Sequence, residues 1–129
     1  MKYKIRQEKK PTLQTFGKYK AVAVHDQTVG SRQIMEEAAE RISGYCYADV
    51  VAVMTTVAEV VNSHLRRGDK VKLRDWGQLK LEIESEKVDR AEDFNARKHI
   101  RGVRLHFIPQ SDKGKPELYQ KLRYEKATV

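Results

Sequence analysis

Few side chains in this 129-residue sequence are of types that perform catalytic or metal chemistry. The sequence contains four histidines and one cysteine, at His25, His64, His99, His106 and Cys46. The histidines are not at metal-ligand spacing, and the cysteine has no second cysteine or paired histidine. Because no nucleophile is paired with a base, we expect a protein that is not an enzyme and that needs no metal or other cofactor. A metal- or nucleotide-dependent enzyme is the most distant alternative.

Single polar residues have ordinary structural interpretations. His64 lies at the edge of an apolar helical stripe and is expected to pack there, and Cys46 is expected to be a structural thiol. His106 shares a strand face with Arg104, where it either meets a phosphate or is solvated surface. The segment 111–116 lacks the Gly-x-x-x-x-Gly-Lys-Ser/Thr frame of a phosphate-binding loop, so we expect a solvated loop there.

Basic side chains are the most informative functional residues. There are 26 Lys and Arg against 18 Asp and Glu, a formal charge of +8, which favours an anionic partner such as nucleic acid. The excess lies at the ends: residues 1–24 hold seven basic and one acidic side chain, and residues 110–129 hold five and three. Residues 25–109 hold fourteen of each, in alternating bands, so a basic stripe there depends on geometry, and each band can equally be solvated surface.

Other classes of protein are excluded by composition. A single cysteine cannot form an intramolecular disulfide. No apolar run approaches the roughly 18 residues of a membrane span. The charged N-terminus lacks the apolar region of a secretory signal. We therefore expect a soluble cytoplasmic protein with no membrane partner and no small-molecule substrate.

The N-terminal third predicts two strands and a helix. Residues 2–6 alternate polar and apolar side chains, and residues 19–24 are rich in strand formers, so these strands pair with each other or extend another sheet. A helical pattern follows Gly30, with Ser31 as the candidate N-cap, and ends at 43–44.

A second helix of about 20 residues begins at 47–49 and ends at Gly68, which is suited to a left-handed C-cap. Its apolar face is broad and consists of Val50, Val53, Met54, Val57, Val60, Val61 and Leu65. Valine is a poor helix former, so burial must hold this helix. A monomer of two helices and three strands cannot cover such a face, whereas a core shared by two chains can.

The pattern then changes to a period of two, which predicts a three-stranded antiparallel meander with one apolar face. Its inward residues are Val71, Leu73, Leu79, Leu81, Ile83, Val103, Leu105 and Phe107. A turn at 75–77 joins the first two strands, and Pro109 closes the last. The polar stretch 84–101 is too long for a tight turn and predicts a protruding arm or a mobile loop. Pro116 is placed to open a short helix over Glu117–Leu122, after which the chain is expected to fray.

The order of these elements resembles the HU/IHF family of bacterial DNA-bending proteins. Three motifs carry the resemblance: Leu-Arg-Arg-Gly-Asp-Lys-Val-Lys-Leu at 65–73, Trp-Gly-Gln-Leu at 76–79 and Phe-Ile-Pro at 107–109. The match covers about residues 28–123. Residues 1–24 look like the extension found in the HU-like subfamily common in Bacteroidetes.

The resemblance implies an α+β fold in an intertwined homodimer, with two N-terminal helices, a three-stranded sheet bearing a protruding β-arm, a short C-terminal helix and extra N-terminal strands. It divides the chain into a basic strand-forming extension (1–24), an HU/IHF-like domain (25–123) and a frayed tail (124–129). The implied function is that of a non-enzymatic architectural protein of the bacterial nucleoid, which binds double-stranded DNA with little sequence specificity through its sheet saddle and arms.

We expect the DNA-binding residues to be cations on the outer strand face and the arm, which contact phosphates rather than bases. These residues are Lys80, Lys87, Arg90, Arg97, Lys98, Arg101 and Arg104. Ordinary charged surface is the competing interpretation of this set. The cations of residues 1–24 either add phosphate contacts or belong to strands that only extend a sheet.

Two departures from the family pattern argue against sharp kinking and strong binding of DNA, and the banded charge with Glu82 and Glu84 favours a different function. The tip region 90–95 lacks the family's wedge-forming proline, leaving Phe94 as a candidate apolar wedge or a loop contact. Glu82 and Glu84 stand where the family tends to place arginines, and carboxylates there would repel phosphates. The alternative is an HU-fold protein-interaction module with weak or no DNA binding, and RNA remains open as a nucleic-acid partner.

Overall fold

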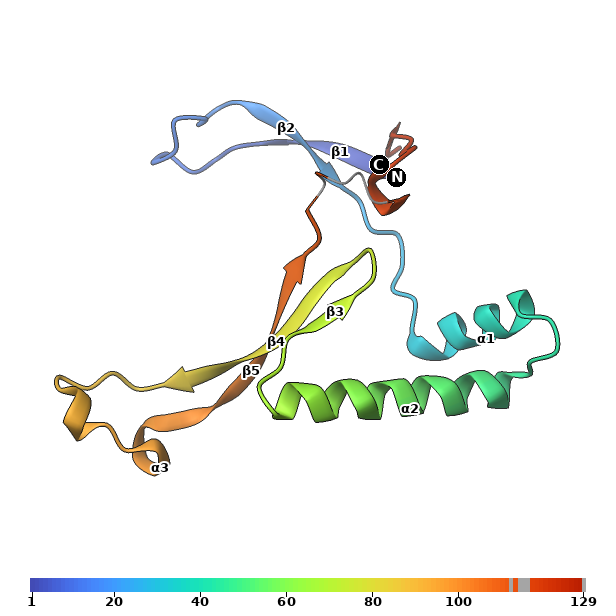
Figure 1. Ribbon diagram of the computed structural model, residues 1–129. Helices are drawn as coiled ribbons and strands as arrows, with labels where there is room; N and C mark the ends of the chain where they lie inside the picture. Colours follow the sequence, from blue (N-terminus) through green and yellow to red (C-terminus); the bar gives the residue numbers. More distant parts are fainter. Residues whose placement is uncertain (112, 114–116, 129) are drawn as a thin grey trace.

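The computed structural model describes residues 1–111, 113 and 117–128, which form two small sheets and a helical hairpin (Figure 1). One sheet joins strands from the two ends of the chain, in the order β2-β1-β6, and the other has the order β3-β4-β5. The helices lie beside the second sheet, with α2 contacting β3 and β4. The chain therefore has an α+β architecture.

The expected N-terminal strands are β1 (Lys2–Gln7) and β2 (Tyr19–Ala23), and they pair with each other in an antiparallel hairpin. The C-terminus differs from the expectation of a frayed tail, because β6 (Glu125–Lys126) pairs in parallel with β1. Backbone hydrogen bonds from Glu125 N–H to the Met1 carbonyl (3.0 Å) and from Ala127 N–H to the Tyr3 carbonyl (2.8 Å) hold it there.

The first helix, α1 (Ser31–Arg41), begins one residue away from the expected cap. Its N-cap is Gly30, with extended φ and ψ of −82° and 167°, and Ser31 is already helical. An N-cap side chain must leave an extended backbone to reach the free N–H groups of the first turn. The expectation for Ser31 is therefore wrong, and no side chain caps this helix start.

The second helix, α2 (Tyr47–Arg66), has the predicted 20 residues. It ends in the predicted left-handed glycine, since Gly68 has a φ of +90°. Gly68 N–H donates to the Leu65 carbonyl at 3.0 Å, and Asp69 N–H donates to the His64 carbonyl at 3.1 Å. These two bonds are those of a Schellman motif, which satisfies the last carbonyls of the helix and turns the chain toward β3.

The meander prediction is confirmed by β3 (Val71–Leu73), β4 (Gly77–Ser85) and β5 (Ile100–Pro109), which are antiparallel neighbours. The register places apolar residues on one face, as the pairs Leu79–Phe107, Leu81–Leu105 and Ile83–Val103. The other face carries the pairs Lys80–His106 and Glu82–Arg104. We call residues 77–109 the β4–β5 ribbon.

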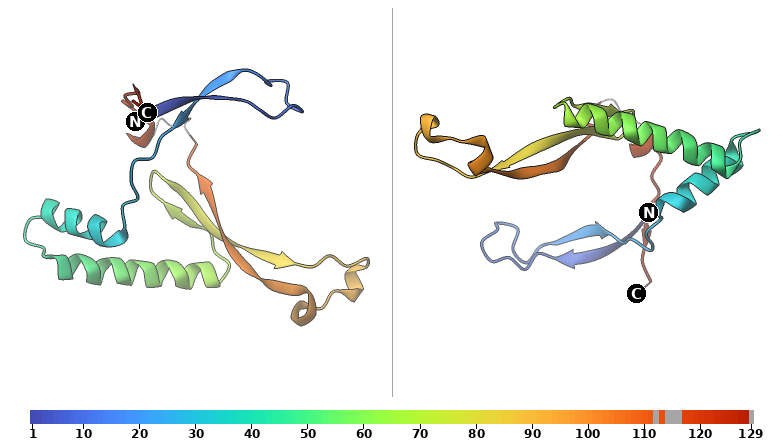
Figure 2. Two further views of the ribbon diagram at one scale, coloured as in Figure 1. Left: turned by 180° about the vertical axis from the view of Figure 1, so that it is seen from behind. Right: turned by 90° about the horizontal axis from the view of Figure 1, so that it is seen from below.

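The stretch 84–101 is more regular than the sequence suggested, because both its ends belong to strands. Between β4 and β5 lie a 3-10 turn, η1 (Ala91–Asp93), and one helical turn, α3 (Ala96–His99). Figures 1 and 2 show this end of the ribbon lying away from the helices.

The expected C-terminal helix is shorter than predicted. Only the 3-10 turn η3 (Glu117–Tyr119) forms, and Leu122 is outside it. Pro116, the expected opening residue, and most of the segment 111–116 lie outside the described residues.

The core of a single chain is small. Among the described residues, only two hydrophobic side chains, Val50 and Leu65, are buried. The accessible surface of the chain is 11893 Å². An apolar face on α2 is left uncovered.

Candidate functional site

The outer face of the β4–β5 ribbon carries an ion-pair cluster around Glu82. The Glu82 Oε1 atom lies 3.5 Å from Lys80 Nζ, and Oε2 lies 3.4 Å from Arg104 Nη2. Partial desolvation raises the pKa of Glu82, but His106, Arg104 and Lys80 together outweigh it and lower that pKa below its ordinary value. Glu82 is therefore a carboxylate at neutral pH and neutralises part of the charge of both cations.

A second pair lies further along the ribbon. Arg101 donates from Nη2 to Glu86 Oε1 at 3.0 Å and from Nε to the same oxygen at 3.3 Å. Glu86 N–H donates to the His99 carbonyl at 2.8 Å, which fixes this position next to α3. Three of the seven predicted site residues, Lys80, Arg101 and Arg104, are thus paired with acids within the chain.

The other four predicted site residues lie near the end of the ribbon and are exposed. They are Lys87, Arg90, Arg97 and Lys98. Within the described ranges, no ion pair involves any of them. The structure thus separates the predicted set into three paired cations on the strands and four free ones toward the tip.

Asn95 and His99 organise the tip of the ribbon. Neither was predicted from the sequence to be a site residue. Asn95 Oδ1 accepts from Arg97 N–H at 3.0 Å, which caps α3, and Asn95 N–H donates to His99 Nδ1 at 2.9 Å. The Phe94 ring lies 5.4 Å from the His99 ring and is 40% exposed. The asparagine before a basic helical turn was a signal for this cap.

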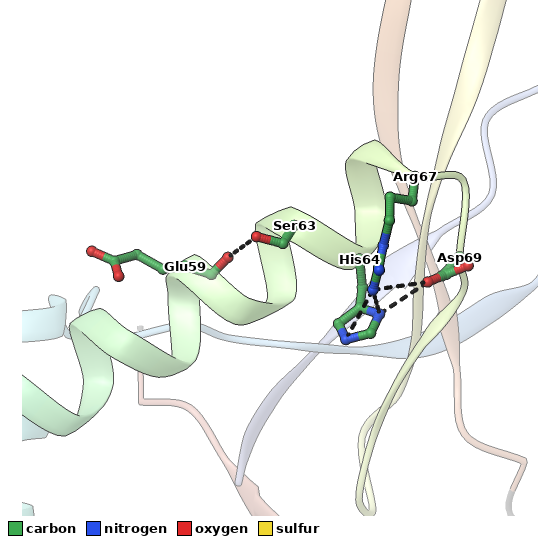
Figure 3. A network of polar contacts seen from close by, with 5 residues as sticks. All are labelled: Glu59, Ser63, His64, Arg67 and Asp69. Carbon is green, nitrogen blue, oxygen red and sulfur yellow. Dashed lines mark hydrogen bonds and ion pairs between the residues drawn. The ribbon is translucent and has the colours of Figure 1, made fainter.

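His64 takes part in a polar network at the end of α2 (Figure 3). Its Nδ1 atom lies 2.9 Å from Asp69 Oδ2 and 2.8 Å from Arg67 Nη2. The hydrogen bond from His64, and then the charges of Arg67 and His64, lower the pKa of Asp69 despite partial desolvation. The sequence did not predict this network, because it forms only where the Schellman turn brings Asp69 back over the last helical turn.

The same helix exposes an apolar groove of about 480 Å³. It is lined by Ala52, Val53, Thr56, Val57, Val60 and Val61. The exposed fractions of Val53, Val57 and Val60 are 56%, 48% and 52%. Half-exposed valines in a row along one helix face are costly in water, so this groove marks a surface that another apolar surface can cover.

The part of the chain that the structure describes contains a free thiol but no metal-binding cluster. No group of three His, Cys, Asp or Glu side chains there is arranged to hold a metal ion. Cys46 is an exposed free thiol at the N-cap of α2, where its N–H donates to Asp49 Oδ2 at 2.9 Å. None of the described helices is both long and apolar enough to span a membrane.

Comparison with known proteins identifies the class of this fold. Over residues 1–123 the chain matches the HU-HIG family model, described as an HU domain fused to wHTH, Ig, or Glycine-rich motif. The chain therefore belongs to the HU-HIG family, and the resemblance seen in the sequence is confirmed. The match begins at residue 1, so the N-terminal hairpin falls within the matched region.

A structural comparison agrees at the level of the fold. The chain is similar to a crystal structure from Bacteroides vulgatus ATCC 8482, provisionally described as a bacterial DNA-binding protein, with a TM-score of 0.66 and 12% sequence identity. The similarity covers 97% of this chain and 47% of that one, so the chain spans about half of its structural relative. No curated protein matches the sequence.

Proposed function

We propose that two copies of this chain form an HU-like dimer that binds duplex DNA with little sequence specificity, as an architectural protein of the bacterial nucleoid. The observation that carries the proposal is the β4–β5 ribbon, which extends beyond the helices and bears free cations toward its end (Figure 1). Two such ribbons on one dimer form a pair of basic projections that can follow a DNA groove. Family membership and the DNA-binding description of the structural relative support this function.

The dimer is supported by the exposed area of the chain. A compact monomer of 15.0 kDa would expose about 7,000 Å², whereas this chain exposes 11893 Å², an excess of about 4,800 Å². Part of that excess belongs to the projecting hairpins. The rest includes the groove on α2, and each chain of an obligate homodimer buries about 1,000–2,500 Å², which is half of the total for the interface. We therefore propose that a second copy of the chain covers the groove on α2, so that the two chains share one apolar core.

Contact with DNA is proposed to be made mostly with the backbone. The β4–β5 ribbon holds seven basic and six acidic side chains, a net charge of +1, so free cations rather than net charge must provide the attraction. Each phosphate contact changes the slope of log K against log salt by about −0.9. We therefore expect affinity that falls steeply with salt and depends little on sequence.

The test is a fluorescence-anisotropy titration of a labelled random-sequence duplex at several salt concentrations. The variant Arg90→Ala/Arg97→Ala/Lys98→Ala, which removes three of the free cations, should bind more weakly than the wild type and should show a slope smaller by about 2.7, at about 0.9 per lost contact. A wild type that fails to bind duplex at low salt, or whose affinity does not change with salt, refutes the function. A single-stranded RNA competitor of equal charge shows whether RNA displaces the duplex.

A protein-interaction module on the same fold is the second candidate. The Glu82 carboxylate favours it, since it lies within 3.5 Å of Lys80 and 3.4 Å of Arg104 and reduces the positive charge of the outer face. A chain that dimerises but does not bind duplex DNA at low salt would support this alternative.

A further inference from the structure

The N-terminal hairpin, residues 2–23, has two chemically different faces. In the antiparallel register, Lys4 lies opposite Val22 and Arg6 opposite Lys20, so three cations share one face. The other face carries Tyr3, Ile5 and Tyr19, with the alanines of β2 opposite the first two. The basic residues of β1 are therefore segregated onto one surface.

Most described cations of this hairpin form no ion pair, in contrast to those on the strands of the β4–β5 ribbon; the exception is Lys2, whose Nζ lies 3.4 Å from Asp26 Oδ2. Lys4, Arg6, Lys18 and Lys20 are exposed, and none forms an ion pair within the described ranges. Glu8 is the only acid in residues 1–24, and its Oε1 accepts from Lys10 N–H at 3.1 Å, in no ion pair with a described residue. The positive charge of the hairpin is thus not cancelled internally.

The same segment contains a broad hollow of about 920 Å³. One acid, Glu8, and exposed Tyr19 line it together with five cations: Lys4, Arg6, Lys9, Lys10 and Lys20. Alternate residues of a strand are about 6.8 Å apart, and the phosphates of one DNA strand follow each other every 3.4 Å or so of helix axis, so two such side chains can reach phosphates of the same strand. Lys4 and Arg6 are therefore spaced to contact a phosphate backbone.

The hairpin is also placed to act together with the β4–β5 ribbon. In every view, the loop ends of both hairpins lie on the same side of the molecule, opposite the connection between α1 and α2 (Figures 1 and 2). A duplex along the ribbon would therefore pass on the side toward which the N-terminal hairpin projects.

We propose that the basic face of the N-terminal hairpin, formed by Lys4, Arg6 and Lys20, is a second phosphate-binding surface for the same DNA duplex. This inference rests on the proposed function. Residues 1–24 have a net charge of +6 and the β4–β5 ribbon has +1, so the N-terminal segment holds most of the excess positive charge of the two. The contact is with phosphates and gives no sequence preference.

The test compares two variants of the full-length protein that lose the same charge. The hairpin variant is Lys4→Gln/Arg6→Gln/Lys20→Gln. The control is Arg32→Gln/Arg41→Gln/Arg66→Gln, which removes three cations from the helices. Far-UV circular dichroism, the melting midpoint and the molar mass must match the wild type in both.

The hairpin variant should bind duplex DNA roughly a hundredfold more weakly at 0.1 M salt, with a slope smaller by about 2.7, which corresponds to three lost phosphate contacts. The control should change the slope by less than about 1, since it removes charge but no phosphate contact. If the wild type binds and the hairpin variant matches the control, the inference is wrong and the proposed function stands. A lower affinity with an unchanged slope also overturns it, because no phosphate contact has then been lost. If the wild type does not bind duplex at all, both proposals fail.

Discussion

The substitution Val57→Asp, in the groove on α2, tests the proposed dimer. Val57 is 48% exposed in one chain. Covering this exposed part in the dimer stabilises the dimer by about 1 kcal/mol per chain. The variant removes that contribution twice per dimer and places two unpaired carboxylates in an apolar seam, at several kcal/mol for the pair. A total of about 4 kcal/mol or more raises the dimer dissociation constant at least about a thousandfold.

The measurement is molar mass by light scattering after size exclusion, over a series of protein concentrations, with circular dichroism on each fraction. The wild type should have twice the mass of the chain at micromolar concentration, and Val57→Asp should have the mass of one chain or be unfolded. Asn62→Asp is the matched control, because it adds the same charge on the same helix outside the groove lining. A wild type that is a folded monomer at micromolar concentration, or a Val57→Asp dimer as tight as the control, refutes the reasoning.

Two further substitutions test local geometry. Gly77→Ala should destabilise the protein by at least about 1–3 kcal/mol, because φ is +149° there and an added Cβ would collide with the Ile108 carbonyl oxygen. Gly102→Ala is the control, because Gly102 has a similar φ of +159° and no atom within 4 Å of the added Cβ. Thermal melting should show a smaller effect for this control. Asp69→Asn tests the network of Figure 3: since the pKa of Asp69 is lowered in the folded chain, its carboxylate stabilises the fold above the ordinary pKa of about 3.9 and that stabilisation is lost as the pH falls through the lowered value. Melting curves from pH 7 to pH 2 should therefore show a shallower acid decline for the variant, and identical declines would contradict the role of the His64 hydrogen bond.

The parts of the fold that sequence could predict are those with strong local periodicity. The valine stripe of α2, with Gly68 after it, defines one helix and its end, and alternation defines β3, β4 and β5. The strand β6 was missed because Glu125 and Lys126 have no apolar alternation. It forms only through pairing with β1, at the other end of the chain, and no local pattern reports such a contact.

The candidate site was predictable as a set of cations but not as a set of contacts. Lys80 and Arg104 stand 24 positions apart, and only the register of β4 with β5 brings Glu82 between them. A one-residue shift in that register would move these side chains to the opposite face, so the pairing could not be read from the charge bands. His64 is a similar case, since its partner Asp69 reaches it only through the turn at Gly68.

The sheet that unites β1 with β6 attaches the N-terminal hairpin to the HU-like part by two covalent connections. The chain leaves this sheet after Ala23 and returns to it at Glu125. A hairpin connected at two points explores a smaller volume than one on a single tether. It therefore loses less entropy when it binds a ligand that the β4–β5 ribbon already holds. If the hairpin binds the duplex as proposed, this double connection gives it a high effective concentration near DNA that is already held by the β4–β5 ribbon.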